Sequence, residues 1–415
     1  MTHDPRGRAA PTGAQPATPE QLLASARTLS TLLAADAARL DAERALPHEA
    51  FARVRASGLL AARVPRHHGG AALSYQALSR ISILLAKGDA SVAQALLPHH
   101  ASVEAIAVQA TSDQRERWFG QVVREGAVFA GAIAERGTRF RTDIRTRLVP
   151  QGPGRWQLDG RKFYSTGGLL ADLLRVVALA PDKQPVCVVV PRTRPGITLA
   201  DDWDGMGQRA TASGTTEFVG VPVAEDEVMP RHGSAAEPCS HAGAAEQLMH
   251  CTVEAGIALA VLDDAVAWAR EGARPVRESG VERSVDDAYV QHTVGRIAAT
   301  AHAAEAMVAR AAAAVDRAAQ AWWAGQLPAA ALDMLGVEAT IAVAEAQAVA
   351  TEAALRAAEQ FYEIGGASAT LRRHNFDRHW RNARTHTTHD PVAYKYKAVG
   401  AYHLSGARPP DALRR

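Results

Sequence analysis

Two alanine-rich segments in the C-terminal half constrain the fold most. Residues 286–324 and 329–364 keep a helical pattern almost without interruption, and the pair Gly365-Gly366 closes the second segment. Helices of this length exceed those of ordinary globular domains and are typical of an antiparallel bundle or a subunit interface. Alanine side chains allow such helices to pack closely. A further helical segment, 247–268, precedes them.

The first half of the chain changes character near residue 128. Apolar residues recur at helical spacing from Pro19 onward, whereas strand-length apolar runs separated by Gly and Pro turns follow between 128 and about 228. The pattern predicts a mixed α and β fold. The expected units are a disordered tail over 1–18, an N-terminal helical domain over 19–127, a central β-domain over 128–235 and a C-terminal helical bundle over 236–415.

Composition excludes several classes of function. Lys+Arg 46 against Asp+Glu 44 gives a net charge of +2 without a basic stripe, so no nucleic-acid partner is expected. The three cysteines form no C-x-x-C pair, which predicts neither a disulfide framework nor a metal site and suits a reducing cytoplasm. No apolar run is long enough for a membrane span. Neither a P-loop nor a strand followed by G-x-G-x-x-G occurs.

The segment 380–391 (WRNARTHTTHDP) concentrates ionisable side chains near the C-terminus. A helix here would place Arg381 with Arg384 on one face, and His386 with His389, and would end at Pro391. The arginines are expected to be structural ion-pair partners. On local grounds the histidines fit either a solvated helix end or a site of proton chemistry.

Four motifs occur in an order that resembles the acyl-CoA dehydrogenase superfamily over nearly the whole chain. They are the stretches 64–70 (VPRHHGG), 159–165 (DGRKFYS), 205–214 (GMGQRATASG) and 219–228 (VGVPVAEDEV). The resemblance implies an N-terminal helical domain, a central β-barrel-like domain and a C-terminal bundle of long helices.

The flavin monooxygenase branch of that superfamily, which includes dibenzothiophene and alkanesulfinate monooxygenases, is the most similar part. The residues that carry this resemblance are 163–167, 207–214, 365–368 and the segment 380–391. It implies a cytoplasmic homotetramer in sulfur metabolism that receives FMNH2 from an NAD(P)H-dependent flavin reductase. A flavin C4a-hydroperoxide formed with O2 would then oxygenate a small organosulfur or other heteroatom substrate.

The resemblance also implies site residues. Ser165 corresponds to a hydroxyl at flavin N5, His386 and His389 to the groups that hold and protonate the peroxide, and His100 or its neighbour His99 to a histidine that faces the flavin. The implied cofactor-binding residues are Gly131, Ser165, Arg209, Ser213, Arg274, Gly365 and Gly366.

Departures from the superfamily pattern leave two alternatives open. Asp390 stands at the place of a glutamate base, and Gly272-Ala273-Arg274-Pro275 replaces an Arg-x-x-Phe element that grips FAD, which favours FMN. Gly131, Ala134 and Glu104 replace an asparagine, a threonine and an aromatic residue. The alternatives are an FAD-dependent acyl-CoA dehydrogenase-like enzyme, with Asp390 or Glu254 as its base, and a non-catalytic scaffold with a degenerate flavin pocket.

Overall fold

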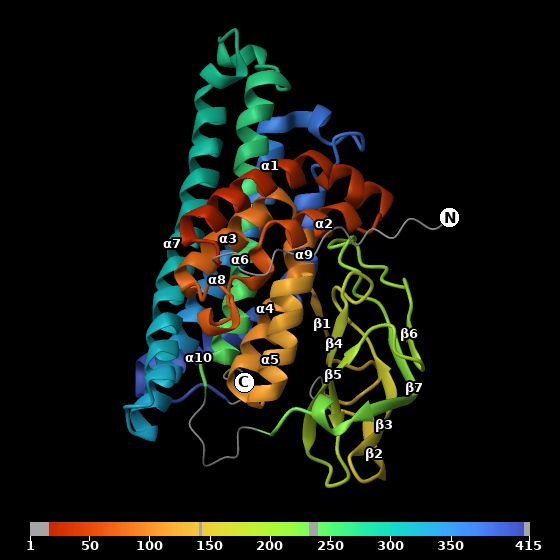
Figure 1. Cartoon of the computed structure of the whole chain (residues 1–415). Coiled ribbons are helices and arrows are strands. Elements are labelled where there is room, and N and C mark those ends of the chain that lie inside the picture. Colours follow the sequence, from red (N-terminus) through yellow and green to blue (C-terminus); the bar gives the residue numbers. More distant parts are fainter. Residues whose placement is uncertain (1–15, 141–142, 232–239, 411–415) are drawn as a thin grey trace, which may run out of the picture.

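The computed structural model describes residues 16–140, 143–231 and 240–410, in which a helical region, a β-sheet and a second helical region follow one another (Figure 1). This succession confirms the predicted mixed fold. Most of the expected tail over 1–18 lies outside the described residues. No helix in the described part of the chain is long and apolar enough to cross a membrane.

The N-terminal region is helical because each major helix has a clear start signal. Thr18 and Gln21 form a capping box at the first helix, and Ser74 and Asp89 accept backbone N–H groups at two later starts. The helices are α1 (Pro19–Glu43), α2 (His48–Ala56), α3 (Tyr75–Gly88), α4 (Ala90–Gln109) and α5 (Ser112–Gly120), with short turns η1 (Leu59–Ala61), η2 (Arg66–His68) and η3 (Gln121–Glu125).

The central region forms one seven-stranded sheet with the order β1-β4-β2-β3-β7-β6, and β5 pairs with β4. β1 runs parallel to β4, whereas β3 runs antiparallel to both β2 and β7. The strands are β1 (Phe129–Ala132), β2 (Arg147–Gly152), β3 (Arg155–Lys162), β4 (Leu173–Leu179), β5 (Pro185–Pro191), β6 (Ile197–Leu199) and β7 (Thr216–Ala224), followed by the turn η4 (Glu225–Glu227).

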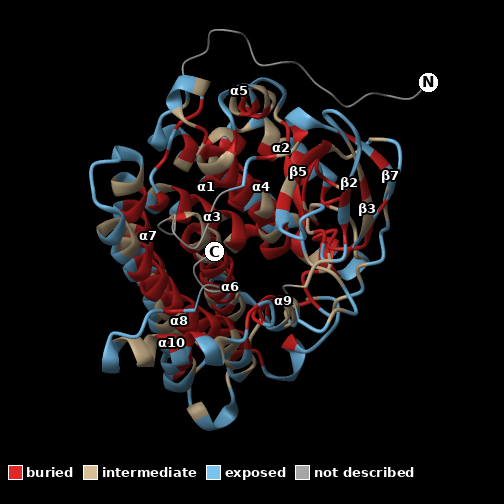
Figure 2. Ribbon diagram, turned by 90° about the horizontal axis from the view of Figure 1, so that it is seen from below, coloured by how far each residue is buried: buried red, intermediate tan, exposed pale blue. Residues whose placement is uncertain are grey.

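The C-terminal region contains the predicted long helices. α7 and α8 lie side by side, and buried residues line α6 and α8 where they face the other helices (Figures 1 and 2). Alanines occupy most buried positions of α8, so the helix axes can approach closely. The helices are α6 (Ala242–Glu271), α7 (Ala288–Ala324), α8 (Ala329–Ala369), α9 (Arg378–His386) and α10 (Val392–Ser405), with short turns η5 (Arg277–Ser279) and η6 (Ser284–Asp286).

Pro98 does not interrupt α4, although a proline inside a helix usually kinks or breaks it. The helix runs unbroken from Ala90 to Gln109, and Ser102 Oγ donates to the Pro98 carbonyl at 2.7 Å. Most residues of α4 are buried, and tertiary packing therefore outweighs the lost backbone hydrogen bond. Pro98 also approaches β1 at Gly131, where a Cβ would lie 3.7 Å from the proline ring.

The helix predicted over 380–391 is also shorter than expected. α9 ends at His386, so His389 lies beyond the helix rather than on its face. Thr387 and Thr388 donate their hydroxyls to the carbonyls of Arg384 and Thr385. Such local bonds compete with helix continuation, and they act here before Pro391 is reached.

Arg381 joins the three regions of the chain. Its Nη2 donates to Asp41 of α1 at 2.6 Å, and its Nη1 donates to the Met206 carbonyl at 3.0 Å. A Cβ on Gly207 would lie 2.0 Å from the Arg381 carbonyl oxygen, so only glycine permits this backbone approach. Asp377 and Asn375 accept further hydrogen bonds from the guanidinium. The ion pairs confirm the structural role expected of Arg381; the structure records no ion pair for Arg384 among the described residues.

We predict that Arg381→Ala lowers the free energy of unfolding by about 3 kcal/mol, because Asp41 keeps its charge at a site that is only 5% exposed. Urea unfolding followed by circular dichroism measures this change. Arg39→Ala is the control, since its pairs with Asp36 and Glu43 are about half exposed. Equal unfolding midpoints for both variants would contradict the stabilising role of Arg381 at this junction.

His99 fastens the N-terminal region to the sheet. Its Nε2 lies 2.9 Å from the Leu60 carbonyl, and its Nδ1 accepts the Phe129 N–H at 3.3 Å. These contacts require a neutral imidazole with the proton on Nε2. Burial lowers the pKa of His99 to about 4.

This lowered pKa predicts acid destabilisation. The folded pKa of about 4 lies below the unfolded value of 6.5, so the unfolded state binds the extra proton first as the pH falls. The contribution of neutral His99 to the free energy of unfolding is fully present above pH 6.5. It is lost as the pH falls towards 4, at about 1.4 kcal/mol per pH unit. His99→Gln should reduce the pH slope of the free energy of unfolding in this window. The exposed His302→Gln should not, and equal slopes for the two variants would refute the assignment.

Candidate functional site

Ser165 lies in a tight turn after β3. The preceding Tyr164 has φ +59, Ser165 N–H donates to the Gly214 carbonyl at 3.1 Å, and the Ser165 carbonyl accepts from Gly168 N–H. A buried ion pair between Lys162 and Glu135 at 2.7 Å fixes the end of the strand. Ser165 Oγ is buried and has no hydrogen-bond partner among the described residues. A buried hydroxyl is seldom left without a partner, which suggests a ligand contact.

The loop 208–214 brings more polar groups to this turn. Ser213 Oγ lies 2.9 Å from Thr166 Oγ1 and 2.7 Å from Thr211 Oγ1. Both amide atoms of Gln208 and the Nε of Arg209 are buried without a described partner. We name residues 163–167 and 208–214 the platform. Its unsatisfied donors and acceptors are of the kind that the ring edge and side chain of a flavin would satisfy.

Gly131 leaves space on the neighbouring strand. It lies in β1, and a Cβ at this position would make only ordinary contacts, at 3.6 Å to Ile133 and 3.7 Å to Pro98. The platform and β1 are linked directly, because Phe163 N–H donates to the Ala134 carbonyl at 2.9 Å. Backbone groups therefore remain at the positions where Gly131 and Ala134 replace hydrogen-bonding side chains.

His386 belongs to a buried polar array. Its Nδ1 lies 3.0 Å from Glu254 Oε1, and its Nε2 lies 3.2 Å from His250 Nδ1. Glu254 Oε2 accepts the Thr351 hydroxyl at 2.8 Å. With the Nδ1 proton of His386 donated to the carboxylate, Nε2 accepts from His250. Glu254 therefore sets the tautomer and the orientation of His386.

His389 lies beyond the end of α9 and contacts the same polar array through His250. Its ring stacks on His250 with centroids 4.3 Å apart and an angle of 22° between the planes. The side chain of His389 is 43% exposed, whereas that of His386 is 1% exposed. The two predicted histidines therefore come together through His250, as an inner and an outer member of one group.

Asp390 is paired with a lysine, so its carboxylate is engaged rather than available to abstract a proton. Lys395 Nζ lies 3.4 Å from Asp390 Oδ2 and donates to Gln247 Oε1 at 3.0 Å. Asp390 Oδ2 also lies 3.8 Å from His389 Nδ1. All three contacts involve buried or partly buried groups. The aspartate therefore orders the segment that carries His389.

His99 and His100 differ in the hydrogen bonds that their rings make. Both ring nitrogens of His99 are engaged by backbone groups, as described above. His100 Nδ1 is buried without a partner among the described residues. Burial lowers the pKa of His100 to about 3, so its ring is neutral. His100 is the neighbour with a ring nitrogen left for a ligand.

His250, His386 and His389 together are named the histidine array. The platform and the histidine array are connected through α9. Asn382 Oδ1 accepts the Gln208 N–H at 2.6 Å. Asn382 lies one helical turn before His386, so it shares a face of α9 with that histidine. The same hydrogen bond therefore positions both the platform loop and the helix that carries His386.

The remaining predicted cofactor-binding residues are Arg274, Gly365 and Gly366. Trp268 Nε1 donates to the Gly365 carbonyl at 3.3 Å, and Gly272 packs closely against the same indole. Arg274 is exposed in the following loop, and Gly366 has φ +55 at a kink in α8. Within the described part of the chain, no recorded hydrogen bond joins this group to the platform.

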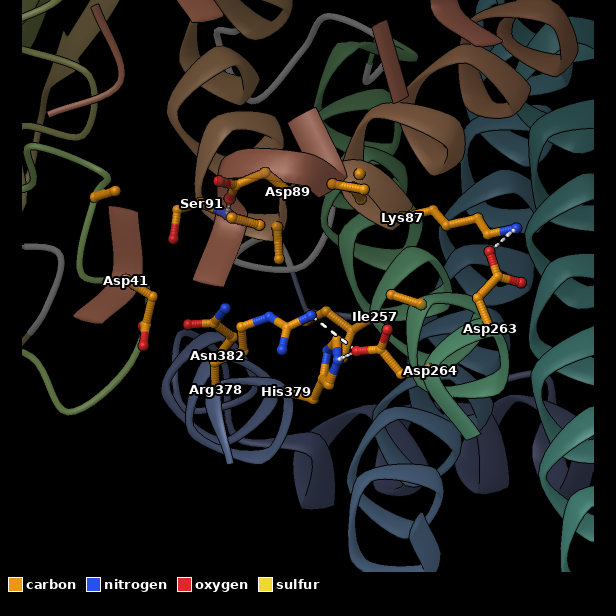
Figure 3. Close-up of a pocket in the computed structure, with 17 residues that line it drawn as sticks. Asp41, Lys87, Asp89, Ser91, Ile257, Asp263, Asp264, Arg378, His379 and Asn382 are labelled. Carbon is orange, nitrogen blue, oxygen red and sulfur yellow. Dashed lines mark hydrogen bonds and ion pairs between the residues drawn. The ribbon is translucent and has the colours of Figure 1, made fainter. Parts of the chain in front are cut away.

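A cavity of about 90 Å³ lies between α1, the α3–α4 junction, α6 and α9, and Ala210 of the platform and Asn382 also line it (Figure 3). Its charged groups are largely paired with one another: Asp264 accepts from Arg378 at 2.8 Å and from His379 at 2.7 Å. Burial raises the pKa of Asp89 in its wall to about 6. None of the predicted catalytic residues lines it. Ligand pockets usually measure about 300–1,000 Å³, so this cavity does not fit a flavin.

Sequence reasoning did not assign roles to His250, Thr351 or Lys395. His250 and Glu254 are four residues apart in α6 and therefore share a face, which was a usable signal. Thr351 and Lys395 come from α8 and α10, and only the tertiary packing of the long helices brings them to the site.

Comparisons with known proteins agree along the chain. Models of the acyl-CoA dehydrogenase N-terminal, middle and C-terminal domains match residues 17–126, 130–221 and 248–393. A dibenzothiophene monooxygenase of Mycolicibacterium goodii is 34% identical over 86% of this chain and 87% of its own length. A probable FMNH2-dependent monooxygenase, SfnC of Pseudomonas putida, is 28% identical over 94% of this chain and 96% of its own length.

Comparison with solved structures supports the same family assignment. The FMN-bound structure of TdsC from Paenibacillus sp. A11-2 superposes with a TM-score of 0.87 at 30% identity, and covers 95% of this chain and 100% of that one. Sequence similarity, domain order and three-dimensional likeness therefore converge on one assignment. The chain belongs to the acyl-CoA dehydrogenase family, among its flavin-dependent monooxygenase members.

Proposed function

We propose that this chain is the oxygenase component of a two-component, FMNH2-dependent monooxygenase that oxygenates a small organosulfur or other heteroatom substrate. One observation carries the proposal most directly. The unsatisfied Ser165 hydroxyl belongs to a platform that Asn382 ties to the helix carrying His386. Two of the proteins named above support this proposal: SfnC is a probable FMNH2-dependent monooxygenase, and TdsC has been solved with FMN bound.

Reduced FMN, when bound, supplies two electrons and two protons, so that one atom of O2 enters the substrate and the other leaves as water. The platform would hold the flavin through Ser165, Arg209 and Ser213, and Gly131 would leave space for it beside β1. The Ser165 hydroxyl would be available to donate a hydrogen bond to it.

The histidine array moves protons. Glu254 holds Nδ1 of His386 and so directs Nε2 of this inner histidine towards His250. His250 lies against both His386 and His389, and the exposed His389 exchanges protons with solvent. His100 lies on α4 with a neutral ring and would face the flavin from that helix.

The dehydrogenase alternative is disfavoured by the state of its two candidate bases. Both oxygens of Glu254 accept hydrogen bonds, from His386 and from Thr351. Asp390 is engaged by Lys395. Neither carboxylate is therefore directed at a substrate proton. The scaffold alternative leaves the buried, unpartnered atoms of the platform unexplained.

Cofactor delivery and assembly complete the proposal. A separate NAD(P)H-dependent flavin reductase supplies FMNH2 in the cytoplasm. Arg274, Gly365 and Gly366 bind the flavin phosphate of a neighbouring subunit in a homotetramer. The exposed aromatic side chains of Tyr289 and Trp323 on α7 support such an assembly, because exposed large apolar groups are common at interfaces.

We predict that Ser165→Ala lowers oxygenation at least tenfold without lowering thermal stability. Its hydroxyl has no hydrogen-bond partner among the described residues, so its removal leaves none of their groups unsatisfied. Differential scanning fluorimetry and product formation with FMN, a flavin reductase and NADH separate the two effects. A loss of thermal stability that accounts for the loss of activity would assign Ser165 a structural role.

We predict that His389→Ala abolishes product formation, by about 100-fold or more, and leaves the fold intact because the side chain is partly exposed. The assay screens thioethers, sulfinates and amines for a mass gain of one oxygen atom. His302→Ala, at an exposed position on α7, is the matched control. Unchanged product formation by His389→Ala would refute its role. The absence of turnover by the unmodified chain, together with tight FAD binding and reduction by an acyl-CoA, would refute the monooxygenase itself.

A further inference from the structure

A second buried polar group lies on α4, one helical turn beyond His100. Glu104 accepts from Arg63 Nη2 at 2.9 Å through one oxygen and lies 2.6 Å from His241 Nε2 through the other. The Arg63 guanidinium carbon lies 4.0 Å above the ring of Tyr75. We name Arg63, Tyr75, Glu104 and His241 the end cluster. Its members come from four separate parts of the chain.

The end cluster is a fixed, net-neutral part of the protein. Burial opposes ionisation of Glu104, but Arg63 and His241 lower its pKa to about 2, so the carboxylate is charged at neutral pH. Its charge is balanced by Arg63. Removing one partner of such a buried pair is strongly destabilising, and the pair therefore does not open for a ligand.

Three buried atoms around this pair lack partners among the described residues: His100 Nδ1, His241 Nδ1 and Tyr75 Oη. The Tyr75 hydroxyl lies close enough to Glu104 to lower its pKa, yet makes no hydrogen bond of ordinary geometry. Because His241 Nε2 faces the carboxylate, Nδ1 is the ring nitrogen left over. Buried polar atoms are rarely unsatisfied, and three of them beside one ion pair indicate a place for a polar ligand group.

The position of the end cluster fits the far end of a substrate site. Glu104 meets His241 at the start of α6, whereas Asp89 and Ser91 line a cavity with Asp264 near the end of α6, so the two helices run antiparallel. At 1.5 Å per residue, Glu104 lies roughly 6 Å along α4 from His100 and roughly 9 Å from Pro98, which contacts β1 beside Gly131. A short aliphatic molecule spans such a distance.

We propose that the end cluster selects a small aliphatic organosulfur substrate that carries a neutral hydrogen-bonding head group, such as a hydroxyl, amide, sulfoxide or sulfone, over fused aromatic sulfur heterocycles. This inference rests on the proposed oxygenase function. An anionic head would face the Glu104 carboxylate and a cationic head would face Arg63, whereas a neutral head meets Tyr75 and the two imidazoles. A flat apolar ring would leave all three atoms unsatisfied.

The test compares substrates that differ in one group. With FMN, a flavin reductase and NADH, 2-(methylthio)ethanol is expected to show a kcat/KM at least tenfold above its isostere 1-(methylthio)propane and above dibenzothiophene. Methanesulfinate serves as the anionic probe. Equal kcat/KM for the alcohol and its isostere, or a preference for methanesulfinate, would overturn the inference.

Tyr75→Phe isolates the head-group contact, because the hydroxyl it removes makes no hydrogen bond of ordinary geometry to the described residues. It should raise KM for the alcohol about fivefold to tenfold, leave kcat nearly unchanged, and leave the thermal midpoint unchanged or higher. Tyr394→Phe, at an exposed tyrosine of α10, should change none of these values. An unchanged KM in Tyr75→Phe would contradict the proposed contact.

A double variant guards against loss of folding. Arg63→Met with Glu104→Leu replaces the ion pair by apolar groups, an exchange that buried pairs often tolerate. It should abolish the preference for the alcohol and raise the relative rate with dibenzothiophene; a retained preference would exclude the end cluster as its source. Hydrogen peroxide release with FMNH2 and O2 distinguishes a failure of the proposed selectivity from a failure of the proposed oxygenase function. Oxygenation of all thioethers alike refutes only the selectivity, whereas oxygenation of none refutes the proposed function.

Discussion

The arrangement of the site depends on the junction at Arg381. This one side chain binds Asp41 of α1 and the Met206 carbonyl at the edge of the platform, while its own backbone lies against Gly207. Asn382, the next residue, holds Gln208. The sheet, the first helix and α9 are thereby fixed relative to one another. Since His386 lies at the end of α9, the same contacts set its distance from the platform.

Around this junction the long helices provide an interior in which polar groups have defined partners. α6 presents His250 and Glu254 on one face, and α8 supplies Thr351 to the same carboxylate. The alanine-rich surfaces of α6 and α8 bring these groups within hydrogen-bond distance. The Glu254 carboxylate thus sets the orientation of His386, on which the proposed proton chemistry depends, and His389 is the exposed member of the array.

Much of the fold was predictable because helical and strand periodicity are strong in this chain. The exceptions have local causes. α4 continues through Pro98 because the helix is almost entirely buried, and α9 stops before His389 because threonine hydroxyls bind its last carbonyls. The roles of Ser165, His386 and His389 followed from motifs and stay predictions. His250 and the end cluster were not predicted, because their partners lie far apart in sequence and meet only in the folded chain.

The origin of the oxygen atom in the product tests the central claim most directly. Under 18O2, with unlabelled water, FMN and a flavin reductase, the account predicts one labelled oxygen atom per molecule of oxygenated sulfur product, and no product when the reductase or FMN is omitted. Product labelled from H2 18O instead of O2, or formed at the same rate without reduced flavin, would contradict it.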